Sequence, residues 1–209
     1  MTTLVIVRHG HTAWNSNDRF RGLVDVPLDE QGLAEAGLVA DAVAERFKAS
    51  TIYASSVDRA MVTAKTIASR FALPVQAEPG LLDADYGKWT GLSFEEAKAR
   101  DPELYDLCIN HASQFRAPGG DSMEEIRERA VAAVKRLTAE HEGETIVLVT
   151  HTLVIRLILL GILGLSTDNF WRIRQDTCAI NVLEYDKGIY YLAAVNDSCQ
   201  VREGMKRRK

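Results

Sequence analysis

Three short runs of apolar, β-branched residues alternate with long segments of helical spacing, and this alternation constrains the fold of the 209-residue chain most. The runs cover residues 4–7, 51–55 and 145–149, and each has the length and composition of a buried strand. Because strands that alternate with helices form parallel sheets with helices on their faces, the sequence predicts an α/β fold.

Helices are predicted between these strands from the spacing of apolar residues and from capping residues. Ser56 stands where it would cap the helix after the second strand, and Ser122 with Glu125 forms a capping box that opens another helix. Pro102 is expected to break the helical segment 93–110. Further helices are expected over residues 29–49, from Ser122 to about residue 140, and from Leu153 onward.

The last strands are expected to form an antiparallel hairpin, since residues 186–188 are turn formers between the β-rich runs 178–185 and 189–195. A short strand is expected around Val75, with a loop over residues 82–91. The elements predict a three-layer α/β/α sandwich with a mainly parallel, mixed sheet and the hairpin at one side. We expect a single domain over residues 1–209.

The charge balance excludes a global basic field for nucleic acid, because 25 Lys and Arg stand against 29 Asp and Glu, a net charge of −4. Only residues 206–209 are basic, and such a short run is expected to be a solvated, frayed end. The most apolar stretch, residues 153–165, contains Arg156 and is too short to span a bilayer. We therefore expect no nucleic-acid or membrane partner.

The N-terminus and the cysteines indicate the compartment. The first residues lack the basic region of a signal peptide. Cys108, Cys178 and Cys199 are widely spaced and odd in number, so neither a disulfide framework nor a zinc finger is expected. A soluble, cytoplasmic protein is the expectation, and the sequence does not indicate an oligomeric state.

Polar residues follow each of the three predicted parallel strands. Arg8 and His9 follow the first strand, Arg59 lies about one turn beyond the second, and His151 follows the third. Because ligands of open α/β sheets bind at the carboxyl ends of the strands, these side chains are expected to meet there. Arginines and the N-termini of the following helices both favour anions. The predicted ligand is therefore a phosphate group.

The sequence disfavours a nucleotide site and a metal site as alternatives to this phosphate pocket. The sequence contains neither a GxxxxGK[ST] loop nor a GxGxxG loop, which disfavours P-loop and dinucleotide sites. The two histidines His9 and His151 with Asp83 could form a facial triad for a metal ion, but two arginines in the same pocket would repel a dication. With no metal and no cofactor expected, a histidine is the candidate nucleophile for phosphorus.

Five motifs in chain order resemble those of the histidine phosphatase superfamily, the phosphoglycerate mutase-like proteins. Residues 7–15, Val-Arg-His-Gly-His-Thr-Ala-Trp-Asn, are similar to its RHG signature. The segment that follows the signature, residues 19–32, is also similar. The other four motifs are the second arginine motif at 53–64, the acid-donor loop at 82–91, and residues 118–122 and 149–151, so that the similarity continues along the whole chain.

The resemblance implies a phosphoglycerate mutase-like fold with His9 as the phosphorylated nucleophile. Phosphoryl transfer spreads charge over three oxygens, so fixed cationic donors do most of the catalysis. His9 would be neutral on its attacking nitrogen, with the N–H of its other nitrogen held by a backbone carbonyl. Catalytic roles are expected for His9, Asp83, His151, Arg8 and Arg59, and phosphate or substrate binding for Arg8, Asn15, Arg21, Gly22, Arg59, His151 and Thr152.

Three positions depart from the family pattern. The proton donor, usually Glu, is Asp83 here, and Asp85 is a rival on the same loop. His11 stands where Glu or Gln is usual, and Thr152 follows the second histidine where Gly is common. The first departure leaves the proton donor open between the two aspartates, and the other two affect substrate choice.

The acid loop favours a phosphatase over a mutase. Mutases of the family are longer and carry a Glu-Arg-His-Tyr-Gly loop, whereas residues 83–87 read Asp-Ala-Asp-Tyr-Gly. We predict a phosphatase that hydrolyses a small phosphomonoester through phosphohistidine, with a cofactor-dependent phosphoglycerate mutase as the alternative. A metal-dependent hydrolase and a non-catalytic phosphate-binding module are weaker alternatives. Residues 86–120 are expected to cover the pocket, and the selectivity candidates are Arg21, His11, Tyr105, Phe115 and Arg116.

Overall fold

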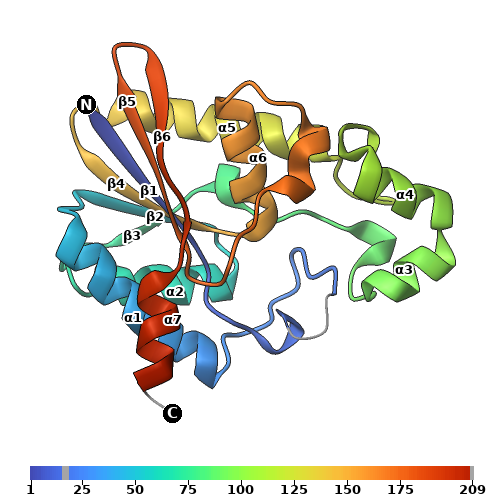
Figure 1. Cartoon of the computed structure of the whole chain (residues 1–209), viewed down its shortest axis with the longest axis horizontal. Coiled ribbons are helices and arrows are strands. Elements are labelled where there is room, and N and C mark those ends of the chain that lie inside the picture. Colours follow the sequence, from blue (N-terminus) through green and yellow to red (C-terminus); the bar gives the residue numbers. More distant parts are fainter. Residues whose placement is uncertain (16–18, 208–209) are drawn as a thin grey trace.

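One sheet of six strands, in the order β3-β2-β4-β1-β5-β6, crosses the computed structural model, which describes residues 1–15 and 19–207. β1 pairs in parallel with β4, and β2 pairs in parallel with β4 and β3, whereas β5 runs antiparallel to β1 and β6 (Figure 1). The predicted mainly parallel sheet with a hairpin at one side is confirmed. The strands are β1 (Thr2–Arg8), β2 (Thr51–Ala54), β3 (Val75–Ala77), β4 (Thr145–Thr150), β5 (Ile180–Asp186) and β6 (Ile189–Asp197).

Helices cover both faces of the sheet, as a three-layer sandwich requires (Figure 1). Successive residues of β1 point to opposite faces, so Leu4 and Ile6 pack in the core beneath α5 and α6, while Val5 and Val7 pack beneath α1 and α2. The helices of the two layers are α5 (Met123–Glu140) and α6 (Thr152–Ile162) on one face, and α1 (Glu30–Arg46), α2 (Asp58–Ala68) and α7 (Cys199–Arg207) on the other.

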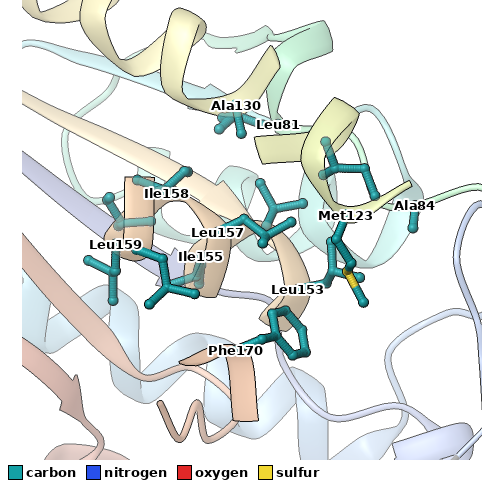
Figure 2. Close-up of a cluster of buried hydrophobic side chains, with 14 of the residues drawn as sticks. Leu81, Ala84, Met123, Ala130, Leu153, Ile155, Leu157, Ile158, Leu159 and Phe170 are labelled. Atoms are coloured by element: carbon teal, nitrogen blue, oxygen red, sulfur yellow. The ribbon is translucent and has the colours of Figure 1, made fainter. Parts of the chain in front are cut away.

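The helix α6 is apolar nearly all round and lies within the core, where it packs against α5 and against β1. Figure 2 shows Leu153, Ile155, Leu157 and Ile158 pointing from α6 to different sides, with Phe170 packed near the first of them. A helix that is hydrophobic on all sides is stable only when buried, and these side chains are at most 5% exposed. The N-terminus of α6 is therefore held firmly at the edge of the sheet.

Two short helices project beyond this sheet edge, and they fall in the segment expected to cover the pocket. The predicted break at Pro102 is confirmed, since Asp101 ends one helix and Pro102 opens the next. Ser93 and Glu96 form a capping box that the sequence interpretation missed. The helices are α3 (Phe94–Arg100) and α4 (Pro102–Asn110), and short 3-10 turns are η1 (Ala13–Asn15), η2 (Pro79–Leu81), η3 (Gly87–Trp89), η4 (Ala112–Gln114) and η5 (Thr167–Arg172).

Three local predictions were wrong. Ser56 does not cap α2, because the N-cap is Val57 and the N–H of Asp58 donates to Asp25 Oδ1 at 2.9 Å. The predicted strand at 178–185 begins only at Ile180, since Cys178 has a φ of 53° and lies in a turn.

The C-terminal run was also expected to be frayed, yet α7 continues through Lys206 to Arg207 and packs Val201 into the core, while Lys206 is exposed as expected. The last two residues of the basic run, Arg208 and Lys209, lie outside the described residues. None of the helices described in residues 1–15 and 19–207 has the length and apolar character needed to cross a membrane.

Candidate active site

A cavity of about 300 Å³ opens at the carboxyl ends of β1 and β4. The two strands are paired in parallel, and Arg8 stands opposite Thr150 at the end of the ladder, so His9 and His151 leave the sheet side by side. Their ring centroids are 5.2 Å apart. The cavity is lined by eight of the predicted site residues: Arg8, His9, Asn15, Arg21, Gly22, Asp83, His151 and Thr152.

His9 is held as a neutral imidazole with one nitrogen available. Its Nδ1 lies 2.7 Å from the carbonyl oxygen of Gly10, and because a carbonyl only accepts, Nδ1 carries the proton and donates. Nε2 therefore keeps its lone pair. Burial lowers the pKa of His9 well below its usual value, and the neighbouring His151 and Arg59 lower it further.

His151 is fixed by a contact that the sequence interpretation missed. It caps α6, and its Nε2 shares a 2.8 Å hydrogen bond with the hydroxyl of Ser55 at the end of β2. Nδ1 lies 3.4 Å from Asp83 Oδ2 and forms no hydrogen bond within the described residues. Burial lowers the pKa of His151 to about 3, outweighing the opposite effect of the Asp83 carboxylate. A neutral His151 thus has Nδ1–H to offer a ligand when Ser55 donates to Nε2.

Two arginines, Arg8 at the end of β1 and Arg59 on α2, are buried and anchored by backbone carbonyls. Arg8 donates through Nη1 to Gln175 O at 2.5 Å, and its buried Nε has no partner among the described residues. Arg59 is fully buried and donates to Val24 O at 2.9 Å and to Gly22 O at 2.7 Å. Burial, helped by the nearby Arg21 charge, lowers the pKa of Arg8 to about 9, so it remains a cation at neutral pH.

Gly22 joins the loop after the RHG signature to the acid loop. Its φ is +52°, and a Cβ at this position would lie 2.3 Å from the carbonyl oxygen of Ala84. Only glycine fits such a close approach in the left-handed region. This approach turns the Gly22 carbonyl toward Arg59 and brings Asp83 into the cavity wall.

The two aspartates of the acid loop have different surroundings. Asp83 is 7% exposed, and its Oδ2 accepts from Arg59 Nη2 at 2.8 Å while its Oδ1 accepts from the N–H of Ala84 at 3.0 Å. Burial raises the pKa of Asp83, but the neighbouring His151 and Arg59 and the Ala84 amide lower it more, and the net shift is downward. Asp85 is exposed, accepts from the N–H of Gly87, and does not line the cavity.

The remaining predicted binding residues lie on two sides of the cavity. Asn15 accepts from the N–H and the hydroxyl of Thr12 at 3.0 and 2.8 Å, and Arg21 donates to that hydroxyl at 3.4 Å. Thr152 is the first residue of α6, and its buried hydroxyl has no partner within the described residues. Both sides of the cavity thus offer hydrogen-bonding groups to an anion bound at the N-terminus of α6.

The facial-triad alternative does not fit these side chains. His9, His151 and Asp83 do lie together, yet no group of three His, Cys, Asp or Glu in the described parts of the chain is placed to hold a metal ion. Both carboxylate oxygens of Asp83 already accept hydrogen bonds, one of them from the Arg59 guanidinium. The arrangement suits an anion better than a cation.

Of the five selectivity candidates, only Arg21 lines the cavity. Phe115 is 2% exposed and packs against Trp89 with ring centroids 5.3 Å apart, so it is a residue of the hydrophobic core and not of the cavity. Arg116 is exposed and paired with Glu125 at 2.5 Å. His11 is paired with Asp29 at 2.6 Å, and neither His11 nor Tyr105 lines the cavity.

Other residues line the cavity that sequence reasoning had not selected. Tyr86, Phe94 and Cys108 come from the segment expected to cover the pocket. Arg156, on α6, was used in the sequence analysis only as an argument against a membrane span. A single arginine in an otherwise apolar helix was nevertheless a signal that this position faces a polar cavity. The others are Trp14, Arg19, Phe20, Met123, Leu153, Phe170, Trp171 and Gln175.

A neutral histidine beside buried guanidinium groups, at the carboxyl ends of parallel strands, is the site of a phosphoryl-transfer enzyme. Residues 4–198 match the histidine phosphatase superfamily (branch 1). The chain therefore belongs to this superfamily, as the five motifs indicated.

Known proteins similar to the chain include phosphoserine phosphatases. Phosphoserine phosphatase 1 of Hydrogenobacter thermophilus is 28% identical over 203 residues, which are 97% of this chain and 96% of that protein. The structure of Bacillus stearothermophilus YhfR matches with a TM-score of 0.90 at 27% identity, covering 96% of this chain and all of the other. A phosphoserine phosphatase variant from Entamoeba histolytica, in complex with phosphoserine, matches with a TM-score of 0.87 at 25% identity, covering 96% and 99%.

These comparisons confirm the fold, which is phosphoglycerate mutase-like, and the enzyme class. The chain is a phosphatase, a phosphoric monoester hydrolase of the histidine phosphatase type, and the mutase alternative is not favoured. The two phosphoserine phosphatases are named for a phosphorylated small molecule.

Proposed function

We propose that His9 Nε2 attacks the phosphorus of a small phosphomonoester, and that water then hydrolyses the phosphohistidine to release inorganic phosphate. In the first step the N–P bond forms as the P–O bond to the leaving alkoxide breaks. The observation that carries this role is the 2.7 Å hydrogen bond from His9 Nδ1 to Gly10 O, which leaves the lone pair on Nε2. The depressed pKa keeps that lone pair free at neutral pH.

The phosphoryl oxygens are proposed to bind between Arg8, Arg59, His151 and the N-terminus of α6. Arg8 Nε, His151 Nδ1 and Thr152 Oγ1 are buried polar atoms without partners among the described residues. Such groups are costly unless a ligand satisfies them, and a phosphate supplies the acceptors that all three need. Fixed donors of this kind stabilise the charge that spreads over the oxygens in the transition state.

Asp83 is proposed to protonate the leaving oxygen and then to accept a proton from the attacking water. Its carboxylate lies beside His151 at the cavity wall, whereas Asp85 points to solvent. In the unliganded pocket the pKa of Asp83 is lowered. A bound phosphate dianion opposes that shift, because its charge disfavours a second anion nearby and it competes for Arg59.

The whole chain is proposed to act as one catalytic domain, with the segment 86–120 as its cover. Support comes from α3 and α4, which belong to this segment, and from Tyr86, Phe94 and Cys108, which line the cavity. A cytoplasmic location is also proposed, since Cys108, Cys178 and Cys199 are all free thiols, as a reducing compartment favours.

The role of His9 is tested by trapping the intermediate. Enzyme mixed with a phosphomonoester labelled in its phosphate and quenched in alkali should retain acid-labile, base-stable label, and His9→Ala should lose it. His111→Ala is the matched control, because His111 is exposed and outside the cavity. Label that survives His9→Ala, or that is stable in acid, would show that another residue is the nucleophile.

A further inference from the structure

Arg156 lines the same cavity as the proposed phosphate site but stands one helical turn away from it. Thr152 and Arg156 are four residues apart on α6, and both line the cavity. Residues at this spacing lie on one face of a helix with their Cβ atoms about 5–6 Å apart. A phosphate at the N-terminus of α6 would therefore leave the rest of a small substrate next to Arg156.

The guanidinium of Arg156 is held in position before any ligand arrives. Its Nε donates to Ile173 O at 2.6 Å. Its Cζ lies 4.9 Å from the ring centroid of Phe170 and 5.1 Å from that of Trp171. The Trp171 ring is fixed in turn, because its Nε1 donates to Cys108 O at 2.8 Å. Contacts with two aromatic rings and a hydrogen bond to a carbonyl thus hold the guanidinium in place.

Arg156 has no carboxylate partner within the described residues, whereas Arg19, also at the cavity, is paired with Glu96 at 3.3 Å. The two terminal NH₂ groups of Arg156 donate no hydrogen bond to the described residues. Burial lowers the pKa of Arg156 to about 10, so the side chain is still charged at neutral pH. A half-buried cation with open donors is costly unless an anion from outside the chain completes it.

We propose that Arg156 is a specificity-determining residue that binds a second anionic group, a carboxylate, of the phosphorylated substrate. This proposal rests on the proposed function. The planar fork of a guanidinium matches a carboxylate through two parallel hydrogen bonds. The cavity of about 300 Å³ and the single turn between Thr152 and Arg156 suit a short phosphoester whose carboxylate is two or three carbons from the ester oxygen.

The test uses two pairs of substrates that differ in the carboxylate alone. O-phosphoserine is paired with O-phosphoethanolamine, and 3-phosphoglycerate with glycerol 3-phosphate, in which a hydroxymethyl group replaces the carboxylate. An aryl phosphate reports on the phosphate site by itself. The variants are Arg156→Gln, Arg156→Lys, and Arg172→Gln as control, because Arg172 is exposed and outside the cavity.

Wild type should prefer the carboxylated member of a pair. Arg156→Gln should lower kcat/KM for that member about 10- to 100-fold, the loss expected for a hydrogen-bonded charge pair, and mainly through KM. Its kcat/KM for the carboxylate-free member and for the aryl phosphate should stay within about threefold of wild type, as should that of Arg172→Gln for all substrates. Arg156→Lys should restore part of the preference, since it keeps the charge without the planar fork.

Two outcomes overturn the proposal while the phosphatase function stands. One is a wild type that hydrolyses both members of both pairs equally well. The other is an Arg156→Gln variant that loses activity equally on carboxylated substrates and on the aryl phosphate, which would make Arg156 part of the phosphate site or of the fold. Failure of the proposed function itself has a different signature: wild type would hydrolyse none of these esters and would form no phosphohistidine.

Discussion

Arg59 Nη2 lies 2.8 Å from Asp83 Oδ2, and both side chains are buried, Asp83 in the cavity wall and Arg59 outside the set of residues that line the cavity. The ion pair positions Asp83 and, against the opposite effect of burial, helps to lower the pKa of its carboxyl while the pocket is empty. A general acid must be protonated, so the proton donation proposed for Asp83 requires that the bound substrate raise the pKa of this carboxyl. The arriving phosphate takes up part of the Arg59 charge and adds negative charge of its own, and both effects raise the pKa of the carboxyl.

Removal of the carboxyl group at Asp83 should affect substrates according to their leaving groups. Asp83→Asn should lower kcat for alkyl phosphates by about 10²–10⁴-fold, the range for a lost general acid, and should lower it much less for an aryl phosphate, whose leaving group scarcely needs a proton. Steady-state rates on both substrate types measure the difference. Asp85→Asn is the matched control and should keep most of the activity. The reverse pattern would make Asp85 the donor.

Activity should not require a divalent metal ion, because Arg8 and Arg59 already supply positive charge to the phosphate site. Full phosphatase activity is expected after dialysis against excess chelator, and vanadate should inhibit as a mimic of the transferring phosphoryl group. Activity that disappears in chelator and returns with Mn²⁺ or Zn²⁺ would support the metal-dependent alternative instead.

The neutral, buried His151 should make folding stability fall in acid. The unfolded chain binds a proton at this histidine below about pH 6.5, whereas the folded chain binds it only near pH 3. Stability from this group is thus complete above about pH 6.5 and declines as the pH falls toward 3, by up to about 1.4 kcal/mol per pH unit. Urea unfolding between pH 6 and 4.5 should show a shallower slope for His151→Asn than for wild type. Equal slopes would mean that His151 is protonated in the folded chain.

A methyl group at Gly22 should destabilise the fold. Gly22→Ala forces a Cβ to within 2.3 Å of Ala84 O at a φ of +52°, and we expect a loss of about 2 kcal/mol or more. Gly37→Ala is the control, because Gly37 lies inside α1 with nothing within 4 Å of a new Cβ. It should stabilise the protein by about 0.5–1 kcal/mol. Equal urea midpoints for Gly22→Ala and wild type would show that the two loops separate readily.

The architecture was predictable because its signals are local. Periods of two and of 3.6 residues identify strands and helices, and the turn at residues 186–188 identifies the hairpin. The proximity of His9 to His151 also followed, since parallel strands bring their ends to one edge. The sequence analysis missed the C-terminal helix α7. This short, polar helix is stabilised by packing against α1, and that contact cannot be read from the sequence of α7 itself.

By itself the sequence determined the fold class and the meeting of His9 and His151 at the ends of β1 and β4, because both follow directly from where the strands end. Only the tertiary structure decided that Ser55 orients His151, that Arg59 holds Asp83, that Phe115 is buried, and that Arg156 faces the cavity. Each of these depends on which side of a loop or helix meets an element distant in the chain. Tertiary packing decides which side of the segment makes the contact, and the local sequence of the segment does not show it.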